Sequence, residues 1–148
     1  MSSNIIGIEC SLYGGRIEHL LQFFSNCPYE FYIKWLQKGP GCNWALPVSF
    51  CNLSVSSSKL RKLAEESIWE LVLQVYPIGS NWQPLETYEE YLLDQCLCCL
   101  LFYDCGMTEI FVKNFELRNQ LHSLLISIGA KDIEIISDES CYRRVFSV

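Results

Sequence analysis

The longest uninterrupted apolar run of the chain, residues 96–103, is the sequence feature that most constrains its fold. Its eight residues fall well short of the roughly 20 that a membrane-spanning helix needs. A run of this length without a polar member is typical of a strand buried on both faces of its sheet. Residues 104–106 lead into a second β-prone segment, residues 107–113, and are few enough to join the two segments as a hairpin.

Further strands are predicted where apolar residues alternate, or where branched and aromatic residues cluster between Gly and Pro. Pro47 limits residues 45–53 to an edge strand or to no strand at all. Two alternating sets are each expected to share a face: Ile6, Ile8, Cys10 and Leu12 in one strand, and Phe31, Ile33 and Trp35 in another. The remaining predicted strands are residues 5–12, 29–36, 45–53, 68–76, 133–136 and 141–148, the last two as a hairpin.

Helices are predicted where apolar residues recur with the spacing of one helical face. The strongest pattern covers residues 115–128, and Asn114 can cap its start. Thr87 begins a capping box for a second helix, and Ser57 or Ser58 can cap a third. The predicted helices are residues 16–24, 59–66, 87–95 and 115–128.

The order of these elements predicts one α+β domain over residues 1–148, with about four helices packed on a mixed, mostly antiparallel sheet. The length of 148 residues fits one compact domain, and the 50% of hydrophobic residues can fill its core. The sequence shows no internal repeat and no linker long enough to separate two domains.

The C-terminal half resembles a family of small uncharacterised proteins from Bacillus-type bacteria, which is classed as a domain of unknown function. The segments that carry this resemblance are Tyr76-Pro77 and residues 86–92, 94–105, 109–113 and 129–139. The resemblance implies a cytoplasmic α+β protein of bacterial or phage origin. It supplies no catalytic residue.

The charge and the cysteines exclude several classes of protein. A net charge of −6 argues against a nucleic-acid partner, whose binding surface would be basic. Nine cysteines, an odd number with irregular spacing, fit reduced thiols better than a disulfide framework. The N-terminal residues have neither the positive charge nor the apolar stretch of a secretory signal. We therefore expect a cytoplasmic protein without membrane association.

Cys96, Cys98 and Cys99 are the first candidates for site chemistry, because two of them would project from the same face of a strand. A zinc site would need a second pair of ligands, and none is visible. A cysteine nucleophile would need a nearby base, but His19 and His122 both fall on predicted helices beside their apolar faces. Core packing is therefore the favoured interpretation. We predict no catalytic residue, metal or cofactor.

Two tryptophans, Trp44 and Trp82, fall in predicted loops, whereas Trp35 and Trp69 fall inside predicted strands and are expected in the core. Each loop tryptophan either folds back as a lid over the core or anchors a partner protein. An acidic helix lies nearby in the sequence, and its face is either simply solvated or forms a negative rim around the aromatic residues. The predicted partner-binding residues are Trp44, Trp82, Glu86, Glu89 and Glu90.

Three functions remain open after the sequence analysis. The leading hypothesis is a non-enzymatic inhibitor, immunity or anti-defence factor that docks on a larger protein. The second is a module that sequesters a nucleotide-like small molecule between loop aromatics and Arg16, Arg143 or Arg144. The third is an enzyme that uses a cysteine or a carboxylate. Chains can also pair through an edge strand at residues 141–148, which would give a homo-oligomer.

Overall fold

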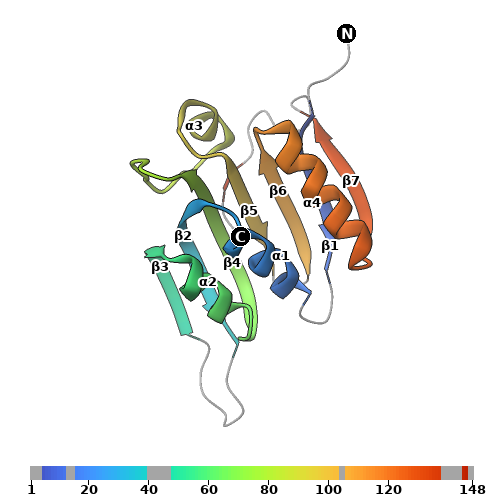
Figure 1. The fold of residues 1–148 in the computed structure, drawn as a ribbon, viewed down its shortest axis with the longest axis horizontal. Coiled ribbons are helices and arrows are strands. Elements are labelled where there is room, and N and C mark those ends of the chain that lie inside the picture. The colour runs from blue at the N-terminus through green and yellow to red at the C-terminus, as the bar shows by residue number, and fades with distance from the viewer. Residues whose placement is uncertain (1–4, 13–15, 40–47, 104–105, 138–144, 147–148) are drawn as a thin grey trace.

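A computed structural model describes residues 5–12, 16–39, 48–103, 106–137 and 145–146. Within these ranges, seven strands form one sheet in the order β3-β2-β4-β5-β6-β1-β7, and neighbouring strands are antiparallel throughout (Figure 1). The predicted α+β class is thereby confirmed, with helices packed on a single sheet. The strands are β1 Ile5–Ser11, β2 Tyr29–Lys38, β3 Val48–Val55, β4 Ile68–Pro77, β5 Cys98–Phe102, β6 Met107–Val112 and β7 Lys131–Ser137. The helices are α1 Ile17–Ser25, α2 Ser57–Leu63, α3 Tyr88–Leu93 and α4 Phe115–Ser127.

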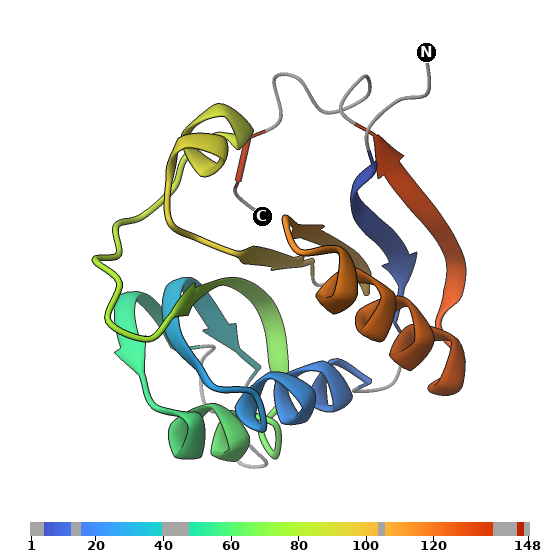
Figure 2. The same ribbon diagram turned by 45° about the horizontal axis from the view of Figure 1, so that its top comes forward.

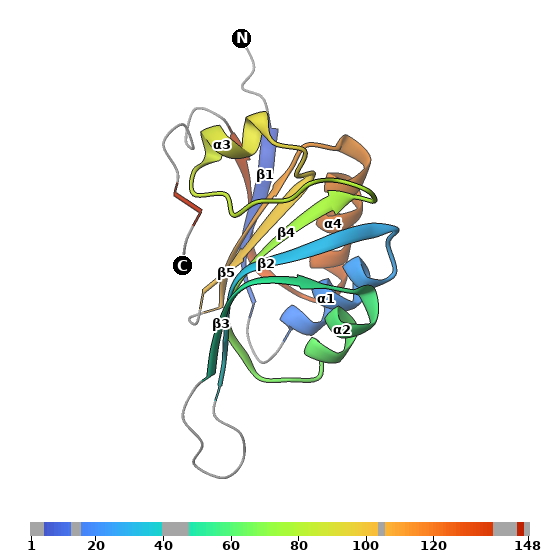
Figure 3. The same cartoon turned by 90° about the vertical axis from the view of Figure 1, so that its left-hand side faces the viewer.

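The sheet is covered on both faces. Figure 3 shows α1, α2 and α4 on one side of it, which we call the first face, and α3 on the opposite side, the second face. The segment that links β4 to α3 is seen most clearly in the tilted view of Figure 2. All residues of β5 are buried, as the apolar run predicted, because β5 lies in the middle of a sheet with both faces covered.

The two faces have different cores. The first face is packed mainly with aliphatic residues, among them Leu20, Leu21 and Leu121 from the helices. The second face holds an aromatic cluster, in which the rings of Phe111 and Phe146 lie 4.9 Å apart. Phe146 is fully buried although it lies only two residues from the end of the sequence. The C-terminal part of the chain therefore completes the second core.

The helix ends follow from local sequence signals. The side chain of Asn114 accepts a hydrogen bond from the backbone N–H of Leu117 at 2.9 Å, as predicted for a cap of α4. Thr87 caps α3 as predicted, but the Glu90 carboxylate of the expected capping box accepts from the N–H of Glu86, one residue before the cap. The predicted cap of α2 was wrong by one residue, since Ser56 takes this role and Ser57 already belongs to the helix.

A β-bulge at Lys34 overturns the predicted alternation of β2. Ile33 pairs with Leu73 and Trp35 pairs with Val72, so Lys34 is an extra residue in β2. Phe31 and Ile33 face the first core as predicted, but Trp35 packs against the second. A similar irregularity between residues 5 and 7 of β1 places Ile6 against the second core, away from Ile8, Cys10 and Leu12.

Two further expectations need correction. Trp69 lies in β4 as predicted but is 39% exposed, because it packs over Gly39 near one end of the strand and outside the core. In the described part of the predicted C-terminal strand, Val145 bridges to Thr87 on the α3 side instead of pairing with β7. β7 pairs with β1 and forms one edge of the sheet. β3 forms the other edge, which is the position that the proline before it in the sequence predicted.

Gly7 is required in β1 because the backbone of β6 lies close against it. A Cβ at this position would clash with the backbone oxygen of Ile110, and a backbone atom cannot rotate away. Gly7→Ala is therefore expected to lower the free energy of unfolding by about 2 kcal/mol. Circular dichroism during urea unfolding measures this loss.

Gly79→Ala is the matched control for this prediction. Its φ of 86° also favours glycine, but nothing lies within 4 Å of the added Cβ. We expect a smaller loss there, about 1 kcal/mol, from backbone strain alone. Equal losses in the two variants would show that the close approach of β1 and β6 is unimportant.

Candidate interaction surface around Trp82

The candidate surface is built by the segment between β4 and α3. A turn follows β4, in which the hydroxyl of Ser80 donates to the carbonyl of Pro77 at 2.7 Å. The backbone N–H of Gly79 donates to the carboxylate of Glu30 at 2.9 Å. These contacts fix the direction in which the chain leaves the sheet, so that it returns across the second face towards α3.

Trp82 stacks on Tyr32 of β2, with ring centroids 4.3 Å apart and planes 23° from parallel. Tyr32 is buried, and its hydroxyl donates to the side-chain oxygen of Asn52 at 2.7 Å. The indole of Trp82 remains 40% exposed. One ring face thus covers the core, as expected of a lid, while other parts of the ring stay accessible. The role of Trp82 as a partner anchor stays a prediction.

Gln74, a buried residue of β4, holds the backbone that follows Trp82. Its side-chain nitrogen donates to the carbonyl of Gln83 at 2.7 Å, and its side-chain oxygen accepts from the N–H of Leu85 at 2.9 Å. A buried amide with both ends bonded specifies one position for the segment it binds. The sequence analysis missed this residue, although a lone Gln inside the β-prone run of residues 68–76 was a visible signal.

Lys34 binds the same segment from β2. Its ammonium donates to the carbonyl of Leu85 at 2.8 Å, to the carbonyl of Phe146 at 2.6 Å and to the carboxylate of Glu86 at 3.0 Å. An ammonium has three donors, and here all three are used. Only 12% of the side chain is exposed. The signal missed here was a single lysine in the apolar stretch of residues 31–36.

An open depression of about 310 Å³ lies beside Trp82. We call it the Trp82 surface, and it is lined by Asn81, Trp82, Gln83, Leu93, Asp94 and Gln95. Leu93 is 93% exposed, and its neighbour Leu92 in α3 is also exposed. Because these exposed apolar residues lie together with a tryptophan, we treat this surface as a candidate interaction site.

The three predicted glutamates have different roles. Glu86 pairs with Lys34, and the carboxylate of Glu90 accepts from the backbone N–H of Glu86 at 2.8 Å. Both therefore support the local structure. Glu89 is exposed, and no ion pair joins it to another described residue. Of the three glutamates, Glu89 is the one whose charge is available to a partner.

Arg16 is the one predicted ligand-binding arginine that the structure describes, and it does not lie at this surface. Arg16 lies before α1, and its guanidinium donates to the carbonyl of Gly129 at the end of α4 at 2.7 Å. Both helices cover the first face, so Arg16 is across the sheet from Trp82 (Figure 3). Trp44, Arg143 and Arg144 lie outside the described residues.

The cysteines of the apolar run lie in the core. Cys96, Cys98 and Cys99 are fully buried, and burial raises the pKa of the Cys96 thiol to about 12. Burial also raises the pKa values of the other two thiols. A nucleophilic cysteine needs the opposite shift. In the described ranges, no three His, Cys, Asp or Glu side chains are placed to hold a metal ion.

The raised pKa values of the buried thiols, that of Cys10 included, predict that the folded state loses stability at alkaline pH. Unfolded thiols release their protons at a pH of about 8.5, whereas burial raises the pKa of Cys10 and Cys96 in the folded chain to about 12. The folded state therefore binds more protons in this interval, and stability falls as the pH rises through it. Urea unfolding at a series of pH values measures the slope.

Two variants distinguish this cause from general alkaline damage. Cys96→Ala removes one buried thiol and is expected to make the slope less steep above pH 9. Cys51→Ser changes an exposed cysteine and is expected to leave the slope unchanged. If both variants kept the slope of the original protein, the buried thiols would not be its cause.

The described residues thus form an α+β fold with a surface depression beside Trp82. The chain belongs to the family described as a protein of unknown function, DUF2691, whose model matches residues 52–147. It is also 28% identical over 76 residues to the uncharacterized protein YncE of Bacillus subtilis strain 168. This alignment covers 51% of the chain and 50% of YncE. The resemblance of the C-terminal half is thereby confirmed.

No solved structure matches the chain. The family match includes all residues of the Trp82 surface but neither Lys34 nor Tyr32, which support that surface from β2. None of the helices in the described ranges is long and apolar enough to cross a membrane.

Proposed function

We propose that this protein is a non-enzymatic, cytoplasmic binding protein that docks on a larger protein through the Trp82 surface. Its role would be that of a small acidic inhibitor, immunity or anti-defence factor. The observation that supports this proposal most strongly is the position of Trp82, which is held against Tyr32 and remains 40% exposed. Tryptophan is enriched among the residues that contribute most to protein–protein binding.

Preorganisation is the second line of support. Gln74 and Lys34 fix the backbone on either side of Leu85, and Trp82 is three residues away. A surface that is ordered before binding loses little conformational entropy when the complex forms. A loop held in this way is suited to present a rigid aromatic anchor.

Charge indicates the kind of partner. The chain carries a net charge of −6, and Glu89 is exposed on α3, one helical turn before Leu93 of the Trp82 surface. A partner with Arg or Lys around an apolar centre would complement it, because a guanidinium also stacks favourably on an indole face. The proposed partner is therefore a protein with a basic patch.

A second candidate function is the binding of a nucleotide-like molecule on the same surface. Side chains of Asn81, Gln83 and Gln95 line the depression beside Trp82, and amides can bond the edge of a stacked base. Of the three arginines considered for a phosphate contact, Arg16 lies on the other face, and Arg143 and Arg144 lie outside the described residues. Protein binding remains the leading proposal, because the stacked and partly exposed Trp82 supports it directly.

Trp82→Ala is expected to weaken capture of the partner at least tenfold. The change removes a rigid anchor, and truncation at such positions typically costs about 2 kcal/mol or more of binding free energy. The measurement is quantitative mass spectrometry of proteins retained by the immobilised variants from an extract of a Bacillus-type bacterium. A protein that the original chain retains and the Trp82 variant loses is the candidate partner.

Trp69→Ala is the matched control, because Trp69 is equally exposed at 39% but lies in β4 outside the Trp82 surface. It should retain the partner. Glu89→Lys reverses a charge on α3 and should weaken capture of the partner about fivefold or less. Glu65→Lys makes the same change beyond the end of α2, away from the Trp82 surface, and should leave capture of the partner unchanged. Equal capture by both tryptophan variants, or release of a bound nucleotide in place of a protein, would contradict the proposal.

A further inference from the structure

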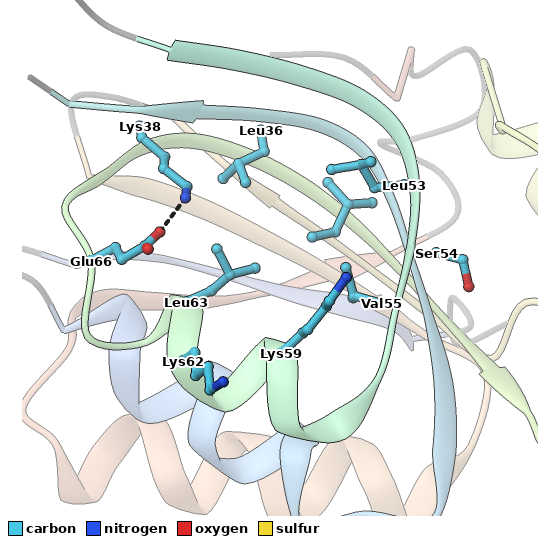
Figure 4. A pocket seen from close by; sticks show the side chains of 10 residues that line it. Leu36, Lys38, Leu53, Ser54, Val55, Lys59, Lys62, Leu63 and Glu66 are labelled. Carbon is cyan, nitrogen blue, oxygen red and sulfur yellow. Dashed lines mark ion pairs between the residues drawn. The ribbon is translucent and has the colours of Figure 1, made fainter.

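A second cavity, separate from the Trp82 surface, lies on the first face between α2 and strands β2 and β3. Its volume is about 240 Å³. Figure 4 shows Leu36, Leu53 and Leu63 pointing towards one another across it, while Ser54 points away. Leu53 and Leu63 are half-buried, so the apolar wall is not closed by the protein itself. The cavity is apolar and open at the edge of the sheet.

The helix α2 explains why the cavity exists. It has seven residues, and its buried Leu60 joins the first core. So short a helix covers the sheet edge only in part, and Val55 of β3 and Leu63 of α2 both line the cavity that remains. A longer helix or a larger residue at either position would fill the gap.

The rim of the cavity is basic. Lys38 forms an ion pair with Glu66, and Figure 4 shows this pair at one end of the cavity. In the described part of the chain, no carboxylate pairs with Lys59 or Lys62. These two lysines are three residues apart on α2 and therefore project on the same side. A protein with a net charge of −6 thus places two uncompensated positive charges beside an apolar cavity.

We propose that this cavity binds a single-chain amphiphilic anion, namely an acyl carboxylate of medium chain length. The aliphatic chain lies among Leu36, Leu53 and Leu63, and the carboxylate lies at Lys59 and Lys62. An apolar cavity of about 150 Å³ takes up benzene, so the larger volume here has room for a chain of about eight to ten carbons. This site is independent of the proposed docking through Trp82.

The probe for the experiment is decanoate, titrated into the full chain at concentrations below its micelle formation. Calorimetry is expected to show one saturable site per chain. Shifts of backbone amide signals in NMR spectra should be confined to β2, β3 and α2. Shortening the probe to octanoate should weaken binding, by up to about fourfold for each CH₂ removed.

Variants test the two parts of the site separately. Lys59→Gln and Lys62→Gln should each weaken decanoate binding about two- to fivefold, and Lys131→Gln in β7 should not change it. Leu63→Trp should fill the cavity and abolish binding, whereas Leu63→Met keeps the side-chain volume and should retain it. Val55→Phe fills the cavity from the opposite wall and serves as a second test if the tryptophan variant does not fold.

Decanol has the same chain without the charge and should bind at least fivefold more weakly than decanoate. Equal binding of the two, unsaturable binding, or decanoate binding that survives both Leu63→Trp and Val55→Phe would overturn the proposal. Binding to phosphatidylglycerol vesicles without binding to decanoate would also overturn it. Trp82→Ala should leave decanoate binding unchanged, so this proposal and the docking proposal can fail independently.

Discussion

The ammonium of Lys34 is the interaction on which the second face of the protein depends. It bonds the carbonyl groups of Leu85 and Phe146, which are 61 residues apart in the sequence, and it also pairs with Glu86. Lys34 faces this side by ordinary alternation with Tyr32, and the β-bulge in β2 brings Trp35 to the same side. Removing the lysine would leave two carbonyl groups in a largely buried position without their donor, which is costly.

This arrangement separates the protein into two surfaces with different chemistry. On the second face, hydrogen bonds from Lys34 and Gln74 hold an extended segment that presents Trp82. On the first face, the short helix α2 leaves an apolar cavity with a basic rim. The rigid surface around Trp82 suits a macromolecular partner, and the open apolar cavity suits an aliphatic chain.

Much of the fold could be predicted from local sequence patterns. The parts that could not be predicted depend on contacts between residues that are far apart in the sequence. The buried strand β5, the capped helix α4 and the edge position of β3 each follow from a few neighbouring residues. The face of the sheet on which Trp35 lies could not be predicted. A β-bulge in β2 changes the alternation of side chains there, and no sequence signal marks it. At the candidate site, Trp82 could be proposed from its loop position, but the roles of Lys34 and Gln74 depend on partners up to 112 residues away. The polar character of these two residues within apolar strands was the available clue.

Native-state hydrogen exchange in a Lys34→Met variant tests the role of this lysine most directly. The backbone N–H of Phe146 donates to the carbonyl of Glu86 at 2.8 Å, so its exchange reports whether the C-terminal segment stays on the second face. The account predicts that this amide exchanges about 10- to 100-fold faster in Lys34→Met, while the amides of β5 keep their protection and a Lys59→Met control behaves like the original protein. A Phe146 amide that stays equally protected without Lys34 would contradict the account.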